Sequence, residues 1–358
     1  MKKNNMKIAM IIPSLLTGGG QKVAMDIAQN DPQFIFIVIG KKQDNFFSKV
    51  VESSHKVYYM NKELGFDPRT FFRIWKILIK EKPNIIHFHL GVSLYGLVPC
   101  FVMRKIKLIY TFHTVAEKDS QGIIRRLCYI GIKYRKMIPV AITETVRESI
   151  LRLYHVDNVK LIYNGIELSK YYSLVDKNNQ ELQLIAVGQI WEAKNHFFLI
   201  DVMVELTRKY SYQKYKLIIL GDGPLKNELE KYITECDMDG FVELKGNVDN
   251  VEKYLARADI FVLSSHYEGL SLATMEAMAS CLPIVSTDVG GMKDLVKDNG
   301  FLVTPGNVAE FANKIAILGE NSKLRKKMGE NSVYDVKKYD VQLMRNEYMK
   351  LYEKIRGR

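Results

Sequence analysis

The sequence predicts an α/β protein made of two doubly wound domains, and three observations carry this prediction. The length of 358 residues suits two domains of ordinary size. Short apolar runs alternate with amphipathic stretches, as in a parallel sheet that helices cover on both faces. This alternation stops in a polar stretch after residue 168 and begins again near residue 182. We therefore expect one domain over residues 1–168 and a second over residues 169–335.

Each apolar run is expected to form one strand. Residues 8–12 read as the first; the lysines before them mimic a signal peptide, but no small-residue cleavage site follows. The other runs of the first domain are 34–40, 84–89, 107–113, 138–143 and 159–165, with helices from about residue 21 and around 71–80. Those of the second domain are 182–188, 215–221, 241–246, 260–265, 283–287 and 300–304.

The end of the chain has a helical pattern. From about Ser332 to Ile355 apolar residues recur on one stripe, which includes Met344, Tyr348 and Leu351. We expect one long helix here, with residues 336–358 packing back towards the first domain.

The composition narrows the class of protein. Hydrophobic residues make up 47% and charged residues 26% of the chain, which excludes long disorder and fibrous repeats. The four cysteines stand far apart, so no redox or zinc spacing is present, and a reducing cytoplasm is the simplest location. The longest apolar run, residues 91–103, is shorter than the roughly 18 to 20 residues that cross a bilayer.

The excess of basic residues lies in the first half of the chain. Residues 1–168 hold 26 Lys+Arg against 13 Asp+Glu, and residues 169–358 hold 26 against 27. On a helical wheel of residues 122–138, the apolar side chains, with Ile123 and Tyr134 among them, lie on one side. The basic side chains largely opposite are Arg125, Arg126, Lys133, Arg135 and Lys136. This pattern fits an ordinary solvated face or docking on an anionic membrane, and the charge asymmetry favours docking.

Ligands of doubly wound domains bind beyond the carboxyl ends of the strands, and two such domains facing one another make a deep cleft. Gly18, Gly19 and Gly20 follow the first strand, where their amides could approach an anion or simply form a tight turn. Glu268 and Glu276 flank the predicted start of a helix near Ser271. The free N–H groups there belong to Gly269, Leu270, Ser271 and Leu272. Such a helix N-terminus could bind a pyrophosphate between two carboxylates. Alternatively, a glutamate in the first turn only stabilises the helix through its interaction with the helix dipole.

The segment from Glu268 to Glu276 resembles the Glu-x7-Glu signature of the retaining glycosyltransferases of family 4, which have the GT-B architecture of two facing Rossmann-like domains. IIPSLLTGGGQKVAMDIA, YTFHT, VKLIYNGIE, LIAVGQIWEAKNH and LIILGDGPLKNELE agree in order and spacing, so the resemblance covers nearly the whole chain. It implies a hexosyltransferase that uses a nucleotide-sugar donor, retains the anomeric configuration and needs no metal or other cofactor. The N-terminal domain would take the acceptor and the C-terminal domain the donor.

The resemblance also implies roles for single residues. Glu268 would contact the donor sugar, Glu276 the ribose, and Lys194 the diphosphate. His113 would hydrogen-bond the donor sugar near the reacting carbon. Gly246, Asn247 and Val248 would frame the base, and Gly18 to Gly20 would approach the phosphates from the opposite domain. Family members usually carry an arginine where this chain has Gln189, and glutamine supplies neither charge nor a bidentate fork to phosphate.

His87 and His89 alternate on one strand face and could ligate a metal, but no carboxylate or cysteine supports them at a suitable spacing. We favour packing at the strand end, with His89 near the acceptor. Together these observations predict sugar transfer to a hydroxyl of a lipid-linked glycan in cell-surface polysaccharide assembly, at the cytoplasmic face of the membrane. The rivals are a nucleotide-sugar epimerase of similar architecture and a nucleic-acid-binding protein, for which we find no RNA- or DNA-binding motif.

Overall fold

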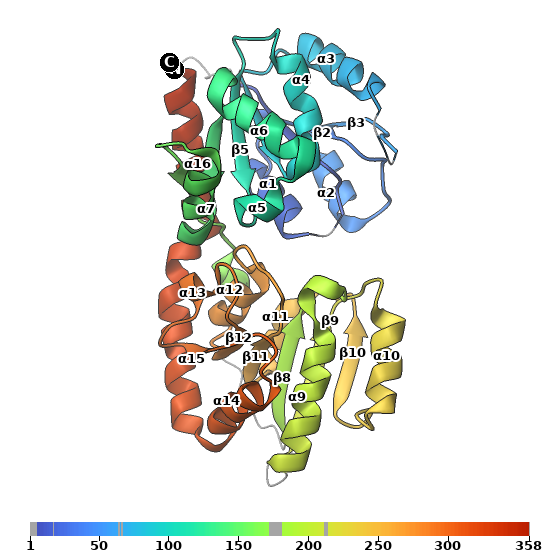
Figure 1. The fold of residues 1–358 in the computed structure, drawn as a ribbon, viewed down its shortest axis with the longest axis vertical. Coiled ribbons are helices and arrows are strands. Elements are labelled where there is room, and N and C mark those ends of the chain that lie inside the picture. The colour runs from blue at the N-terminus through green and yellow to red at the C-terminus, as the bar shows by residue number, and fades with distance from the viewer. Residues whose placement is uncertain are drawn as a thin grey trace. The chain divides into compact units, whose positions relative to one another are not determined.

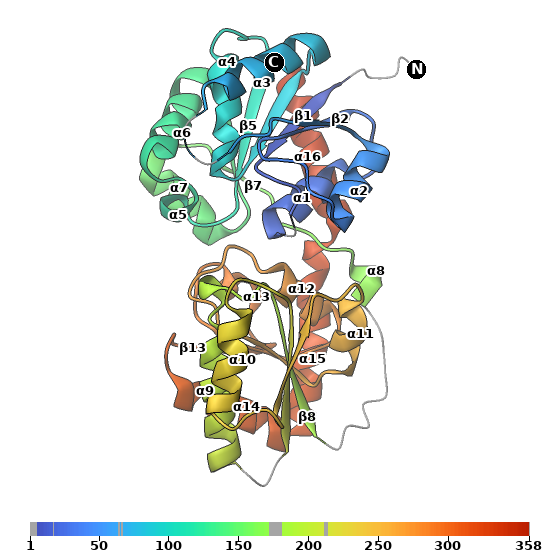
Figure 2. The same cartoon turned by 90° about the vertical axis from the view of Figure 1, so that its right-hand side faces the viewer.

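The structure is a computed structural model that describes residues 6–16, 18–63, 65, 67–171, 181–210 and 214–357. The chain folds into two compact units, drawn in Figures 1 and 2. The N-terminal unit consists of Met1–Gly165 and Val341–Arg358, and the C-terminal unit of Ile166–Asp340. The expected boundary at residue 168 therefore lies three residues beyond the point where the chain passes from one unit to the other.

The N-terminal unit is a seven-stranded parallel sheet in the order β3-β2-β1-β4-β5-β6-β7. Its strands are β1 (Ile8–Ile12), β2 (Phe34–Val38), β3 (Lys56–Tyr59), β4 (Ile85–His89), β5 (Lys107–Phe112), β6 (Ile138–Ala141) and β7 (Lys160–Leu161). Its helices are α1 (Gly19–Ala28), α2 (Phe46–Ser54), α3 (Arg69–Glu81), η1 (Gly91–Gly96), α4 (Leu97–Cys100), α5 (Ala116–Asp119), α6 (Gly122–Arg135), α7 (Glu144–Tyr154) and α16 (Val341–Arg356). Strands β1, β2 and β4 are buried along their whole length, as expected of continuous apolar runs covered on both faces.

The C-terminal unit holds a six-stranded parallel sheet in the order β10-β9-β8-β11-β12-β13. Its strands are β8 (Leu182–Val187), β9 (Tyr215–Leu220), β10 (Val242–Gly246), β11 (Ile260–Leu263), β12 (Ile284–Thr287) and β13 (Gly300–Val303). Its helices are α8 (Leu168–Tyr171), η2 (Glu192–Lys194), α9 (His196–Lys209), α10 (Lys226–Glu235), α11 (Val251–Arg257), α12 (Leu272–Ala279), α13 (Met292–Leu295), α14 (Val308–Glu320), α15 (Ser322–Val336) and η3 (Lys337–Tyr339). The prediction of two Rossmann-like domains is thus confirmed.

The C-terminal helical segment differs from the expectation of one long helix. It is divided into α15, η3 and α16, and the break falls where the chain passes between the units. Asp340 is extended and forms a β-bridge with Ile166, and the Ile166 N–H donates to the Tyr339 carbonyl at 2.9 Å. The prediction of a single helix was wrong because the stripe of apolar residues continues through the break, while the backbone at Asp340 pairs with another segment.

The basic helix α6 also departs in part from its prediction. Arg135 was expected to face a membrane, but its guanidinium donates to the carbonyls of Cys100 at 2.9 Å and Met103 at 3.3 Å. Ile123 and Tyr134, which the helical wheel placed on the apolar side, are 67% and 66% exposed. The packed face of α6 holds Cys128 and Gly131, with Arg135 beside them. The prediction differed because a helical wheel does not show which stripe faces the rest of the unit. Among the described residues, no helix has both the length and the apolar character to cross a membrane.

Candidate active site

Lys194 and Glu268 meet at the carboxyl edge of the C-terminal sheet. Lys194 ends η2, just after β8, and Glu268 follows β11, the neighbouring strand. The Lys194 ammonium donates to Glu268 Oε1 at 2.5 Å, and the Ser265 hydroxyl donates to the same oxygen at 2.6 Å. The two ion-paired side chains keep 20% and 11% of their surface exposed, so both can still reach a ligand. A ligand that offers an anion and hydroxyl groups could take up both partners of this pair.

The loops that hold this pair are locked by the backbone. Ser264 donates to the Lys194 carbonyl at 2.8 Å, and the His266 N–H donates to the Ala193 carbonyl at 2.8 Å. A Cβ on Gly290 would lie 1.9 Å from the Glu268 carbonyl oxygen, and its φ of +51° also favours glycine. This close approach requires a glycine after β12. The position of Glu268 is therefore fixed by segments that follow three adjacent strands.

Helix α12 begins where the sequence predicts. Ser271 caps it, because its hydroxyl accepts from the Thr274 N–H at 3.2 Å. The backbone N–H groups of residues 269–272 have no acceptor among the described residues. Glu268 lies three residues before this cap, and Glu276 lies inside the helix with 9% of its surface exposed. The helix tip thus presents free amides beside the Lys194–Glu268 pair, an arrangement suited to an anion.

The ends of β8, β9 and β10 lie close together. The Gly221 N–H donates to the Gly246 carbonyl at 2.8 Å, and a Cβ on Gly221 would lie 2.0 Å from the Gly188 carbonyl oxygen. Gly246 has a φ of +67°, and the predicted base-framing residues Asn247 and Val248 follow it in the turn before α11. Gln189, directly after Gly188, is exposed and supplies no charge. Lys194 supplies a cationic group at this edge.

In the N-terminal unit, three histidines form a cluster at the carboxyl ends of β4 and β5. His89 Nδ1 lies 2.9 Å from His113 Nε2, and the rings of His87 and His89 are tilted by 42° with centroids 4.1 Å apart. His87 and His89 are fully buried, while His113 is partly exposed. Burial lowers the pKa of His113 to about 4 and holds the pKa values of His87 and His89 well below their usual range. The cluster is therefore neutral near pH 7.

Buried hydroxyl groups from α16 hold the lower part of this cluster. Tyr352 Oη hydrogen-bonds His87 Nδ1 at 2.7 Å, and His87 Nε2 hydrogen-bonds Thr111 Oγ1 at 2.7 Å. Tyr348 Oη lies 3.0 Å from Thr111 Oγ1. His89 Nε2 is buried without a partner among the described residues. His89 was expected near the acceptor, but its buried ring contacts His113, so it can act on a ligand only through that residue.

Asp119 fixes the backbone at His113, and the sequence analysis missed it. Its Oδ2 accepts from the His113 N–H at 3.0 Å, and its Oδ1 accepts from the Tyr110 hydroxyl at 2.5 Å. Burial raises the pKa of Asp119 to about 6, although these hydrogen bonds oppose the shift. Ser265 was missed in the same way. Asp119 and Ser265 are both polar residues that follow a strand next to a candidate site residue. That position in the sequence is the local signal that could have identified them.

The glycines after β1 pack against the histidine cluster. Gly18 caps α1, Gly19 is exposed, and a Cβ on Gly20 would lie 3.2 Å from the His113 ring and 3.2 Å from the Leu90 side chain. Glycine at position 20 therefore lets the first turn of α1 approach His113 closely. The amides of this turn and the exposed edge of His113 form one surface of the N-terminal unit.

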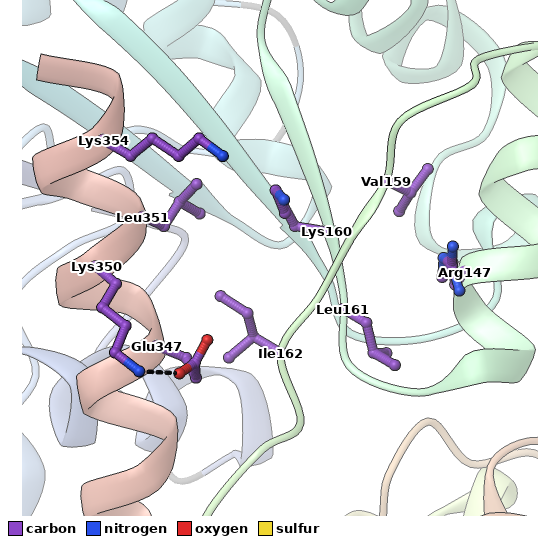
Figure 3. Close-up of a pocket in the computed structure, with 9 residues that line it drawn as sticks. All are labelled: Arg147, Val159, Lys160, Leu161, Ile162, Glu347, Lys350, Leu351 and Lys354. Atoms are coloured by element: carbon purple, nitrogen blue, oxygen red, sulfur yellow. Dashed lines mark hydrogen bonds and ion pairs between the residues drawn. The ribbon is translucent and has the colours of Figure 1, made fainter. Parts of the chain in front are cut away.

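A separate groove of about 410 Å³ lies in the N-terminal unit between α7, β7 and α16 (Figure 3). Its lining residues are Arg147, Val159, Lys160, Leu161, Ile162, Glu347, Lys350, Leu351 and Lys354. Two of its four cations are already paired, Arg147 with Glu144 at 3.1 Å and Lys350 with Glu347 at 2.7 Å. None of its lining residues belongs to the histidine cluster.

In the part of the chain that the structure describes, no group of three or more His, Cys, Asp or Glu could hold a metal.

Two family profiles match the chain, one for each half. Residues 17–170 match "Glycosyltransferase Family 4", and residues 174–333 match "Glycosyl transferases group 1". The chain belongs to glycosyltransferase family 4. As a glycosyltransferase it is an enzyme of the class that the Glu268–Glu276 pattern indicated.

Curated relatives of this glycosyltransferase span most of its length. It is 23% identical over 342 residues to "UDP-Gal:alpha-D-GlcNAc-diphosphoundecaprenol alpha-1,3-galactosyltransferase" of Escherichia coli, with 87% of each chain covered. It is 24% identical over 369 residues to "GalNAc-alpha-(1->4)-GalNAc-alpha-(1->3)-diNAcBac-PP-undecaprenol alpha-1,4-N-acetyl-D-galactosaminyltransferase" of Campylobacter jejuni, with 98% of this chain and 99% of the relative covered.

Solved structures share the fold of this glycosyltransferase. HepE of Anabaena, crystallised with UDP and glucose, superposes with a TM-score of 0.85 at 19% identity, covering 98% of this chain and all of the other. TarM of S. aureus superposes with a TM-score of 0.78 at 16% identity, covering 97% and 98%. At these identities the similarity establishes the fold alone.

Proposed function

We propose that this glycosyltransferase moves a sugar from a nucleotide diphosphate donor to a hydroxyl group of a lipid-linked glycan, with retention of the anomeric configuration and without a metal. The observation that carries the donor assignment is the Lys194–Glu268 ion pair beside the free amides of α12. The curated relatives from E. coli and C. jejuni, whose names specify undecaprenol-linked acceptors, support the acceptor class.

The residues of the C-terminal unit would bind the two ends of the diphosphate sugar. The Lys194 ammonium and the amides of residues 269–272 would stabilise negative charge on the diphosphate as it leaves, the largest demand in this kind of transfer. Glu268 would then accept hydrogen bonds from the sugar hydroxyls, and Glu276 would bind the ribose. Donor binding thus replaces the ion pair with two ligand contacts, so neither charge is left unpaired.

The transfer step moves one sugar and one proton. The bond between the anomeric carbon and the diphosphate oxygen breaks, and the acceptor oxygen forms a bond to that carbon on the same face. The acceptor proton passes to an oxygen of the departing diphosphate, so no carboxylate needs to act as a base. His113, neutral because it is buried, would hold a sugar hydroxyl without adding positive charge beside the developing oxocarbenium ion.

We further propose that the protein associates peripherally with the anionic inner face of the cell membrane. Four of the basic residues predicted to face it remain candidates on or beside α6, namely Arg125, Arg126, Lys133 and Lys136. Arg126 and Lys136 are exposed and make no ion pair among the described residues, whereas Arg125 donates to the Ser120 carbonyl at 3.3 Å. Each cation near such a surface adds about 1 kcal/mol to binding.

Thermal unfolding of the protein with a panel of nucleotide diphosphate sugars tests the donor assignment, because a cognate donor raises the melting temperature by mass action. The selected donor is then supplied with an undecaprenyl diphosphate-linked sugar, with and without a metal chelator. We expect an α-linked product from an α-linked donor, equally fast in both conditions. An inverted linkage, a need for metal, or a free epimerised sugar formed without acceptor would each contradict the proposal.

A further inference from the structure

Helix α3 carries an apolar stripe that the rest of the N-terminal unit does not cover. Phe72, Trp75 and Ile79 are 64%, 40% and 47% exposed. At about 100° per residue these three side chains lie on one stripe. The buried face of the helix is formed by Thr70, Ile74, Leu78 and Glu81, so the exposed stripe points largely away from the core. More than half of the large exposed apolar side chains among the described residues fall between positions 72 and 134.

Helix α4 extends this stripe. It lies next to α3 at one end of the N-terminal unit, as both views show (Figures 1 and 2). Val98 in α4 is 38% exposed, and Val102, just after its end, is 76% exposed. We call the surface formed by Phe72, Trp75, Ile79, Val98 and Val102 the α3–α4 face. An apolar area of this kind on a surface helix has an interaction partner more often than isolated exposed side chains do.

Cations border the α3–α4 face on one side. Arg69, Arg73, Lys76 and Lys80 form a second stripe of α3, next to the apolar one on the helical wheel. Arg104 and Lys105 follow Val102 after one residue, Met103, and are exposed. Lys76, Arg104 and Lys105 form no ion pair among the described residues. Residues 69–80 and 97–107 contain no Asp or Glu at all, so the border is mainly cationic, with Arg69 paired to Asp67 at 3.0 Å.

The apolar side chains and the cations beside them together indicate the kind of partner that the α3–α4 face binds. A helix with aromatic and aliphatic residues on one face and only Lys and Arg beside them is suited to lie in the headgroup region of an anionic bilayer. We propose that the α3–α4 face inserts shallowly into an anionic lipid bilayer, with Trp75 among the inserted side chains. The proposal rests on the proposed peripheral membrane association and names the surface that inserts.

Trp75 provides a direct readout. The chain has two tryptophans, Trp75 and Trp191, so Trp191→Phe leaves Trp75 as the only one. We expect its emission to shift to the blue and to be quenched by brominated acyl chains when vesicles contain phosphatidylglycerol. Vesicles of phosphatidylcholine alone should produce little change, and added salt should weaken the response. The matched variant Trp75→Phe, which keeps Trp191, should show neither effect.

Polar variants separate the α3–α4 face from α6. Phe72→Ser with Ile79→Ser should weaken binding to the anionic vesicles at least tenfold, while Leu343→Ser, a 51% exposed leucine on α16, should leave it within twofold. Arg126→Glu with Lys136→Glu on α6 should weaken binding without abolishing the Trp75 shift. Circular dichroism checks that each variant is folded.

Several outcomes would overturn the proposal. These are no response of Trp75 to anionic vesicles, an equal response to neutral ones, or a response lost only in the α6 variant. A concentration-dependent dimer that Phe72→Ser with Ile79→Ser converts to a monomer would assign the face to a second copy of the chain instead. Transfer to a short-chain, water-soluble acceptor should be unchanged in the Phe72→Ser, Ile79→Ser variant. Loss of vesicle binding with this activity intact therefore separates the docking face from the proposed function.

Discussion

The two units bring different kinds of groups to the carboxyl ends of their strands. In the C-terminal unit, Lys194 and Glu268 form an ion pair that solvent can reach, beside helix amides with no acceptor. In the N-terminal unit, His87, His89 and His113 form a neutral buried cluster held by hydroxyl groups. A charged pair that solvent can reach can exchange its partner for a ligand, whereas a buried neutral network is sensitive to the loss of any member. We therefore expect substitutions in the Lys194–Glu268 pair to reduce activity mainly. Substitutions in the histidine cluster should reduce stability as well.

The largest expected effect is on turnover in the C-terminal unit. Glu268→Ala and Lys194→Ala should each lower kcat/KM by about 10²- to 10³-fold, because each removes a contact that stabilises the leaving diphosphate or the sugar. The free energy of unfolding should fall by about 1–2 kcal/mol, since the side chains of the lost ion pair keep only 20% and 11% of their surface exposed. Steady-state kinetics and urea unfolding measure the two quantities. Activity near that of the unmodified enzyme in both variants would rule out the donor site.

In the N-terminal unit the largest expected effect is on stability. Asp119→Ala leaves the His113 N–H and the Tyr110 hydroxyl without their acceptor, which should lower the free energy of unfolding by about 2–4 kcal/mol. Glu117→Ala is the matched control, because Glu117 pairs with Arg152, whose side chain is 71% exposed. Its loss should cost less than about 1 kcal/mol. Equal unfolding midpoints for the two variants would show that the buried acceptor does not stabilise the unit.

The pH dependence of stability should next test the burial of the histidine cluster. His113 has its pKa lowered from 6.5 to about 4, so its contribution is complete above pH 6.5 and is lost as the pH falls through 4. The pKa of Asp119 is raised from 3.8 to about 6, so Asp119 acts in the opposite sense. Its contribution to stability is lost as the pH rises through 6.

Three histidines oppose one carboxyl, so the free energy of unfolding should rise between pH 4 and 6.5. His113→Asn should reduce that slope by at most about 1.4 kcal/mol per pH unit. Urea titrations across this range provide the measurement, and an unchanged slope would mean that His113 titrates normally.

The smallest expected effect tests the packing of α1 on the cluster. Gly20→Ala places a Cβ 3.2 Å from the His113 ring, which must move by a few tenths of an ångström. Such a displacement should lower kcat/KM by about tenfold with little change in stability. Gly240→Ala is the control, since its Cβ would meet no atom within 4 Å. If both variants have the same activity, the position of His113 does not limit the reaction.

The sequence predicted the sheet cores well because burial on both faces leaves a continuous apolar run. Strand β1 and the Ser271 cap fall at the expected residues. Strand β3 was missed because it lies at the sheet edge, where its residues are exposed or only half-buried and form no such run. The break before α16 was missed because a backbone pairing with Ile166, rather than a local residue preference, produces it.

The candidate site was predictable to a lesser degree. Lys194 and Glu268 are separated by 74 positions, and only the family pattern placed them in one site. The contact between His87 and Tyr352 spans 265 positions and involves two residues with no local motif. Periodicity reports which face of an element is buried, but it does not report which distant polar side chain will meet a buried histidine. Such partners follow from strand order and helix packing, which one sequence does not reveal.

The assignment of α16 to the N-terminal unit has a consequence for biosynthesis. During synthesis, every residue of the C-terminal unit has been added once Asp340 is in place. The N-terminal unit, although begun first, still lacks Tyr348 and Tyr352, so His87 and Phe34 remain without their partners. It is completed only when the last turn of the chain emerges from the exit tunnel. A nascent chain truncated at residue 340 would therefore carry a finished second unit and an unfinished first one.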